Sequence, residues 1–160
     1  MTRTLQIEPL TTRTFAPFGA IIAPPDREPD ISTEFNRYWD GAAPFRVQGV
    51  PQIAFLRVFQ RSLVVPSLER HFTHTQAFIP LRGHPLVFVL APPSEGEPEL
   101  DRVRAFLLDG TTGVVLHEGT WHHLLFPLVP EAHVLLLLQE GTKENDMHVT
   151  HLPEPVEVRF

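Results

Sequence analysis

The sequence predicts an all-β protein: an antiparallel barrel or sandwich of short strands with few short helices. Seventeen of its 160 residues are proline, about twice the usual share, and proline interrupts helices and is confined to turns and edges in sheets. Short runs of apolar, β-favouring residues alternate with Gly and Pro, a spacing typical of barrels and sandwiches. A chain of this length is expected to form one domain over residues 1–160.

The expected strands follow from these runs in order. They are 53–59, 76–81, 86–90, 104–108, 113–117, 122–126, 133–139 and 156–160. Arg82-Gly83, Asp109-Gly110 and Glu118-Gly119 have the composition of turns or bulges. The proline-rich, acidic stretches 23–30 and 91–99 are expected to be loops, and 99–104 a short helical turn.

Charge and composition exclude several functions. The net charge is -6 and no long basic run occurs, so neither nucleic acid nor an anionic membrane is expected as a partner. A small anionic substrate can still be held by one or two basic side chains. Without cysteine the chain has no disulfide, thiolate nucleophile or zinc–thiolate site. Residues 1–10 lack the uninterrupted apolar stretch of a signal peptide, and no apolar run approaches the ~20 residues that span a bilayer. We therefore expect a cytoplasmic protein.

Nine histidines are present, and most lie in two clusters. In the first, Glu69 and His71 are two residues apart and share one face of an extended strand, with Gln76 a short distance on. In the second, His122 and His123 are adjacent, so only one of them is expected to point inward. The two clusters can place a carboxylate and imidazoles beside one ligand.

The spacing within both clusters is similar to the two cupin motifs. Glu69, His71, Gln76 and Gly83 occupy the positions of the first motif, where cupins carry two histidines, a glutamate and a glycine. His117-x-Gly119-x-x-His122 resembles the second motif, with His in place of Pro. The resemblance implies a cupin-like antiparallel β-barrel (a double-stranded β-helix). It also implies a divalent metal ion such as nickel, manganese or zinc on His71, Gln76 and His122, and no organic cofactor.

Longer stretches resemble the ureidoglycolate lyase (ureidoglycolate hydrolase) family. The signatures are 69–71 (ERH) with 75–81 (TQAFIPL), and 119–125 (GTWHHLL). The segments 10–19, 37–38 and 104–106 are also similar, so that the resemblance covers nearly the whole chain in order. It implies a homodimeric carbon–nitrogen lyase of the amidine-lyase type that splits ureidoglycolate into glyoxylate and urea during allantoin (purine) breakdown.

Two positions depart from the family pattern. His74 stands where a small residue such as glycine is expected, and Gln139-Glu140 stands where the family tends to carry Asp-Arg. His74 can crowd the pocket or add a ligand, and the change at Gln139-Glu140 can alter the choice of substrate or abolish the activity.

The expected chemistry needs an anion clamp, a base and an acid. Arg57, with help from Arg37, is assigned to the substrate carboxylate, unless its strand turns Arg57 to the surface. Gln76 and His123 are further substrate contacts. His71 or His122, with Glu69, is expected to be catalytic, because imidazole titrates near neutral pH; alternatively, a metal ion chelates the substrate carboxylate and hydroxyl.

Two other functions fit the same residues. One is a non-catalytic cupin that binds a small carboxylate as a sensor or regulator. The other is a different metal-dependent cupin enzyme, such as an oxygenase or isomerase. Turnover of ureidoglycolate and the metal content of the purified protein distinguish these three hypotheses.

Overall fold

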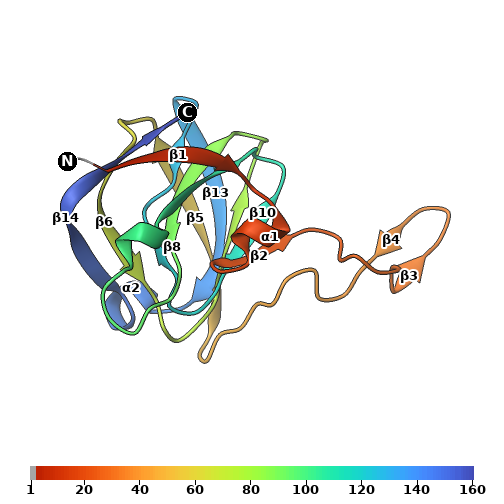
Figure 1. Cartoon of the computed structure of the whole chain (residues 1–160). Helices are drawn as coiled ribbons and strands as arrows, with labels where there is room; N and C mark the ends of the chain where they lie inside the picture. The colour runs from red at the N-terminus through yellow and green to blue at the C-terminus, as the bar shows by residue number, and fades with distance from the viewer. Residues whose placement is uncertain (1–2) are drawn as a thin grey trace.

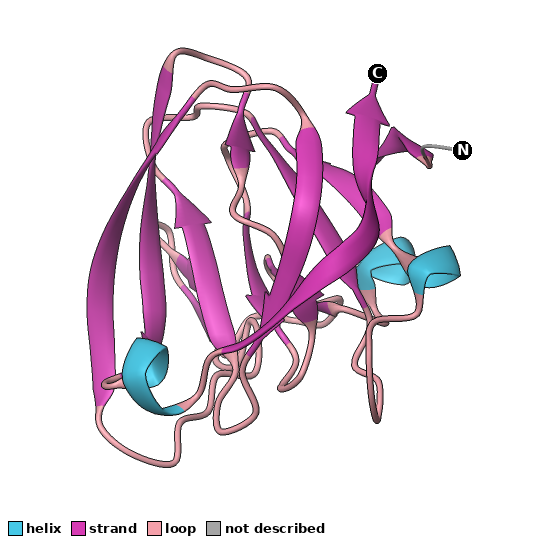
Figure 2. Ribbon diagram, turned by 90° about the vertical axis from the view of Figure 1, so that its left-hand side faces the viewer, coloured by secondary structure: helices cyan, strands magenta, loops and turns pink. Residues whose placement is uncertain are grey.

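The computed structural model describes residues 3–160. Strands dominate, and helices are limited to single turns at the edge of the molecule (Figure 1 and Figure 2). The elements in chain order are β1 (Thr4–Pro9), α1 (Thr12–Phe15), β2 (Gly19–Ile22), β3 (Ile31–Ser32), β4 (Arg37–Tyr38), β5 (Pro51–Phe59), β6 (Val64–Arg70), β7 (Gln76–Pro80), β8 (Leu86–Ala91), the 3₁₀ turn η1 (Leu100–Arg102), β9 (Arg104–Leu108), β10 (Gly113–Leu116), β11 (Trp121–His122), β12 (Phe126–Pro127), β13 (Glu131–Gln139), α2 (Thr142–Asn145) and β14 (His148–Arg159).

Two sheets form the walls of a cupin-type barrel. One has the strand order β11-β6-β14-β1-β9-β8-β12 and the other β2-β10-β7-β13-β5. The predicted all-β barrel is confirmed, but it is not wholly antiparallel, because β1 pairs parallel with both β14 and β9. The pairing of β1 with β14 brings the two ends of the described chain to the same end of the barrel (Figure 1).

The predicted strands are largely confirmed where apolar runs are continuous. The run 122–126 is the exception: it divides into β11 and β12. Between them the chain leaves the sheet, where Arg61 donates hydrogen bonds to the carbonyls of Leu124 and Leu125. The turn predictions are also confirmed, since Arg82, Gly83, Gly110 and Gly119 all have positive φ.

The strands β1 and β2, most of β6 and of β14, and the β3–β4 hairpin were not expected from the sequence; within β6, only the extended chain at Glu69 was. In β6 a proline and polar residues interrupt the apolar pattern, and the strand exists because it pairs with β14 along most of its length. Pairing between segments so distant in sequence leaves little local signal.

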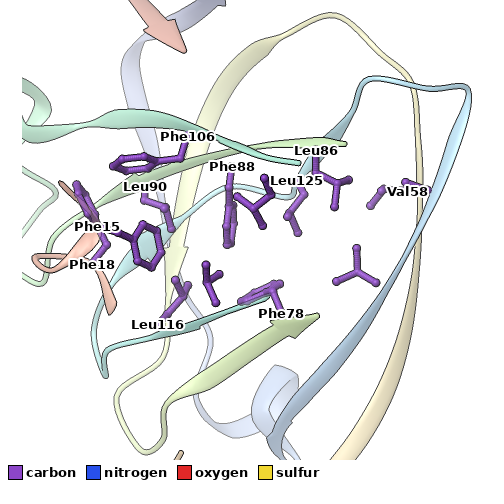
Figure 3. Close-up of a cluster of buried hydrophobic side chains, with 14 residues drawn as sticks. Phe15, Phe18, Val58, Phe78, Leu86, Phe88, Leu90, Phe106, Leu116 and Leu125 are labelled. Carbon is purple, nitrogen blue, oxygen red and sulfur yellow. The ribbon is translucent and has the colours of Figure 1, made fainter. Parts of the chain in front are cut away.

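The core is aromatic at one end and aliphatic at the other (Figure 3). Phe15, the last residue of the single turn α1, and Phe18, three residues further on, both pack edge-on against Phe106, with ring centroids 5.3 and 5.2 Å away. Phe78 and Phe88 meet edge to face at 4.8 Å across the two sheets. These rings fix the separation of the walls and so the position of the site between them.

Residues 23–50 form an arm that projects from the barrel and carries the β3–β4 hairpin near its tip (Figure 1). The side chain of Phe35 on this arm is 88% exposed. The returning segment is fixed to the barrel, because the carbonyl oxygen of the Gln139 side chain accepts hydrogen bonds from the backbone of Gln48 and Gly49, both at 2.8 Å. No helical segment within residues 3–160 is both long and apolar enough to cross a membrane.

Candidate active site

A cavity of about 730 Å³ lies between the two sheets, beside α2. Its apolar lining includes Leu56, Phe78 and Leu136, from three neighbouring strands of the second sheet. Its polar lining includes Glu69, His71, Gln76, His122 and His123. An apolar cavity of this size with a few convergent polar groups is the usual form of a small-molecule site.

His71 is held in one tautomer. It follows the last residue of β6, is buried, and its Nδ1 lies 2.7 Å from the backbone carbonyl of Asp146. A carbonyl oxygen can only accept a hydrogen bond, so Nδ1 carries the proton and the neutral ring keeps a lone pair on Nε2. That nitrogen is therefore free to bind a proton or a metal ion.

His122 is arranged in the same way from the opposite strand. Its Nδ1 donates to the carbonyl of Thr120 at 3.1 Å, and its ring packs edge-on against Phe78 and Phe88. The register of β11 against β6 sets His122 directly opposite Glu69, and its Nε2 lies 3.5 Å from Glu69 Oε1. Sheet register thus joins the two histidine clusters.

The polar atoms of the site form a cation-binding set. One ligand atom each from Glu69, His71 and His122 lies within 4.8 Å of the others. The side-chain oxygen of Gln76 is buried and has no hydrogen-bond partner among the described residues. Two imidazole lone pairs, a carboxylate and an amide oxygen are all acceptors, and a buried acceptor without a donor is costly. A divalent metal ion satisfies such a set, so these residues fit the metal expected of a cupin.

The protonation states agree with this arrangement. Burial, and after it the charge of neighbouring His122, lowers the pKa of His71 from 6.5 to about 4. Burial favours the neutral acid of Glu69, but the neighbouring imidazoles, His122 first among them, outweigh it and bring the pKa of Glu69 below its usual value. At neutral pH the site therefore contains a neutral His71 and an ionised Glu69.

His123 borders the same cavity but faces a second one as well. Its Nδ1 donates to the carbonyl of Ser67 at 2.8 Å, and burial lowers its pKa. Both adjacent histidines therefore border the cavity, contrary to the expectation that only one points inward. They differ in that His122 belongs to the acceptor cluster of Glu69, His71 and His122, whereas His123 does not.

The two arginines assigned to the substrate do not line the cavity, and the structure corrects both placements. Arg57 makes paired hydrogen bonds of 2.9 and 3.0 Å to Glu131 on the outer face of β5. Side chains alternate along a strand, and Leu56 takes the inner face. Arg37 lies on the projecting arm, where it donates hydrogen bonds to the carbonyls of Thr33 and Asn36.

Two residues near the cavity, Lys143 and Asp146, were not predicted as site residues from the sequence. Lys143, from α2, is the one lysine or arginine among the described residues that line the cavity. Asp146, just after α2, is buried and bonded to the segment that follows His71. Both lie in a short polar stretch without periodicity, so only the tertiary structure brings them to the site.

A barrel of two sheets with imidazoles and a carboxylate converging in an apolar cavity defines a cupin-type enzyme centre. The fold is similar to that of a 3,4-ketoisomerase from Thermoanaerobacterium thermosaccharolyticum, solved as a mutant with TDP-4-keto-6-deoxyglucose, at a TM-score of 0.50 and 18% identity over 81% of this chain and 85% of that chain. At this level of identity the likeness establishes the fold alone.

Sequence comparison identifies the family. Residues 2–159 match the ureidoglycolate lyase family. A ureidoglycolate lyase of Azotobacter vinelandii is 35% identical over 158 residues, covering 89% of each chain. One of Stutzerimonas stutzeri is 37% identical over 155 residues, covering 89% of this chain and 87% of that protein. The chain belongs to the ureidoglycolate lyase family.

Proposed function

We propose that the protein is a lyase that splits ureidoglycolate into glyoxylate and urea, a late step in the breakdown of purines through allantoin. Family membership supports the substrate. The observation that carries the chemistry is the convergence of Glu69, His71 and His122 within 4.8 Å at an apolar cavity.

The reaction needs one proton to move between two atoms of the substrate. Ureidoglycolate is a carbinolamide: its hydroxyl loses a proton, the aldehyde carbonyl forms as the carbon–nitrogen bond breaks, and the bonding electrons leave with the urea nitrogen, which takes a proton. No proton is consumed overall and no covalent intermediate with the protein is needed. A single group that accepts and then returns the proton is sufficient.

His71, His122 and Gln76 would hold a divalent ion, and two imidazoles with an amide oxygen suit nickel, manganese or zinc. When bound, such an ion would lower the pKa of the substrate hydroxyl and polarise the developing carbonyl. His71 suits a holding role because its low pKa keeps Nε2 unprotonated at neutral pH.

Glu69 is the group that carries the proton. Its side chain is 30% exposed, whereas that of His122 is 4% exposed, so the carboxylate is the more accessible member of the pair. Being ionised at neutral pH, it can accept the hydroxyl proton and return it to the departing nitrogen. The base expected at His71 or His122 is therefore reassigned to Glu69 in this proposal.

Lys143 is the partner for the substrate carboxylate. It lines the cavity, and its nearest acidic neighbour, Glu144, is 3.6 Å away in an exposed pair. Replacing Lys143 with Met should raise KM about fivefold, because an exposed ion pair contributes up to about 1 kcal/mol. Arg57→Met is the matched control and should leave KM unchanged. Equal effects of the two substitutions would contradict the assignment.

The decisive experiment is an assay of glyoxylate, urea and ammonia from racemic ureidoglycolate, with and without added nickel, manganese or zinc. Equal amounts of glyoxylate and urea, formed well above the spontaneous rate, are expected. His122→Ala should abolish this turnover while the circular dichroism spectrum is preserved, and His151→Ala, an exposed histidine on β14, should not. Ammonia in place of urea would indicate amide hydrolysis, and no acceleration with any metal would refute the proposal.

We also propose that the protein is a homodimer joined through the outer face of β5. Ile53, Phe55 and Phe59 project from this edge strand and are 72, 58 and 57% exposed. In the register of β5 with β13, Phe55 and Ile53 lie opposite Leu135 and Leu137, which extend the apolar face. The Arg57–Glu131 ion pair lies on the same face, between Phe55 and Phe59. Exposed apolar side chains gathered on one face of a monomer mark an interaction surface, and a second copy of the same face is a complementary partner in a two-fold contact.

A further inference from the structure

Asp146 binds residues 71–73 through both its backbone carbonyl and its side chain. Its backbone carbonyl accepts the 2.7 Å hydrogen bond from His71 Nδ1. Its carboxylate accepts hydrogen bonds from the backbone N–H of Phe72 at 2.9 Å and of Thr73 at 2.8 Å, and from the Thr73 hydroxyl at 2.6 Å. The residue is only 4% exposed. One buried aspartate is therefore hydrogen-bonded both to the imidazole of His71 and to the two residues that follow it, Phe72 and Thr73.

The position of Asp146 is itself fixed by α2. Its backbone N–H donates to the carbonyl of Thr142 at 2.8 Å. Thr142 Oγ1 donates to the carbonyl of Gln139 at 2.5 Å, and the side-chain amide of Gln139 donates to Thr73 Oγ1 at 3.1 Å. These bonds form a closed circuit between the end of β13, α2 and the segment after His71.

His74 packs the other side of the imidazole. This residue, one of the two departures from the family pattern, is 1% exposed and its ring stacks on that of His71 with centroids 5.5 Å apart and planes 17° from parallel. Its Nδ1 lies 3.6 Å from Asp146 Oδ2 and its Nε2 lies 3.3 Å from Thr142 Oγ1. The ring of His71 is thus restrained along its N–H bond and across its face.

We propose that Asp146 is a positioning residue, which keeps His71 in the tautomer that leaves Nε2 unprotonated towards the cavity. The carboxylate does this by fixing the segment after His71 against α2, so that the Asp146 carbonyl stays in line with Nδ1. A group that orients a catalytic histidine in this way typically affects activity about 10–100-fold when it is lost. The expected effect on turnover rests on the proposed function, whereas the effect on the tautomer does not.

The test is Asp146→Ala, examined by long-range ¹H–¹⁵N NMR of the histidine side chains at pH 8 without added metal. In the unmodified protein His71 should be protonated on Nδ1 alone, and in the variant it should become a mixture of tautomers. We expect kcat to fall about 10–100-fold with KM nearly unchanged. Asp146→Asn retains one acceptor oxygen and should restore part of both signals; it also carries the test if the alanine variant does not fold.

Asp109→Ala is the matched control. Asp109 makes the same kind of bonds in a turn outside the cavity, to the backbone N–H of Thr111 at 2.8 Å and to its hydroxyl at 2.7 Å. It should leave the His71 tautomer and kcat unchanged.

A fall in kcat at Asp146→Ala with the His71 tautomer intact would overturn the proposal, since a general loss of structure would explain it. A mixed tautomer with unchanged kcat would overturn the link to catalysis. If the unmodified protein does not turn over ureidoglycolate at all, the proposed function fails, but the tautomer measurement still decides what Asp146 does to His71.

Discussion

Replacing Glu69 with Gln separates proton transfer from metal binding. Glutamine has the shape of glutamate but cannot accept the substrate proton at neutral pH. A positioned proton-transfer group contributes about 10²- to 10⁴-fold to a rate, so we expect kcat to fall about 10³-fold, which is about 4 kcal/mol in the activation free energy. Because the Glu69 side chain is 30% exposed, removing its negative charge should change the free energy of unfolding by less than about 1 kcal/mol.

Three measurements on the purified variant test this prediction. The release of glyoxylate and urea gives kcat and KM, elemental analysis gives the metal content, and thermal unfolding followed by circular dichroism gives the stability. If His71, His122 and Gln76 are the metal ligands, the variant should keep its metal while losing turnover. Glu140→Gln is the matched control, because Glu140 lines the same cavity from the end of β13, and it should retain activity.

Two results would refute this reasoning. A Glu69→Gln enzyme whose kcat lies within about tenfold of the original would show that the proton is carried by another group. A variant that loses its metal as completely as His122→Ala would show that Glu69 is a metal ligand, and the role in proton transfer would have to be withdrawn.

Three further predictions concern stability, pH and assembly. Phe88→Ala should lower the free energy of unfolding in urea by about 3–5 kcal/mol, because this fully buried ring packs against Phe78; a loss below about 1 kcal/mol would contradict the packing. The free energy of unfolding should fall as the pH drops from 6.5 towards about 4. In this range His71 binds a proton in the unfolded chain but stays neutral in the folded protein, where burial lowers its pKa, so protons favour the unfolded state. His71→Gln should flatten this part of the pH curve, and an equally steep curve would be evidence against the His71 shift. Phe55→Glu should produce a monomer in light scattering after size exclusion, and a monomeric unmodified protein would contradict the proposed dimer.

The local pattern of the sequence was sufficient for much of the architecture. Continuous apolar runs such as 53–59 and 86–90 form strands because β-favouring side chains act over a few residues. The turns at Gly110 and Gly119 follow from glycine's access to positive φ. The period of two along a strand places Glu69 and His71 on one side, so two of the three residues of the acceptor cluster could be inferred from one short segment.

The tertiary structure decided which distant residues meet. His122 reaches Glu69 because β11 pairs with β6 in one register, and a shift of one residue would present His123 instead. Arg57 faces outward for the same reason, since the inner face of β5 is taken by Leu56. Lys143 and Asp146 are brought to the site by the single turn α2, which is too short to show a periodic pattern of apolar residues in the sequence. Period, propensity and turn chemistry are local and can be read along the chain, whereas register and loop closure depend on partners far away in sequence. The sequence by itself therefore determined the kind of barrel and one strand of its centre, and only the folded chain determined the complete site.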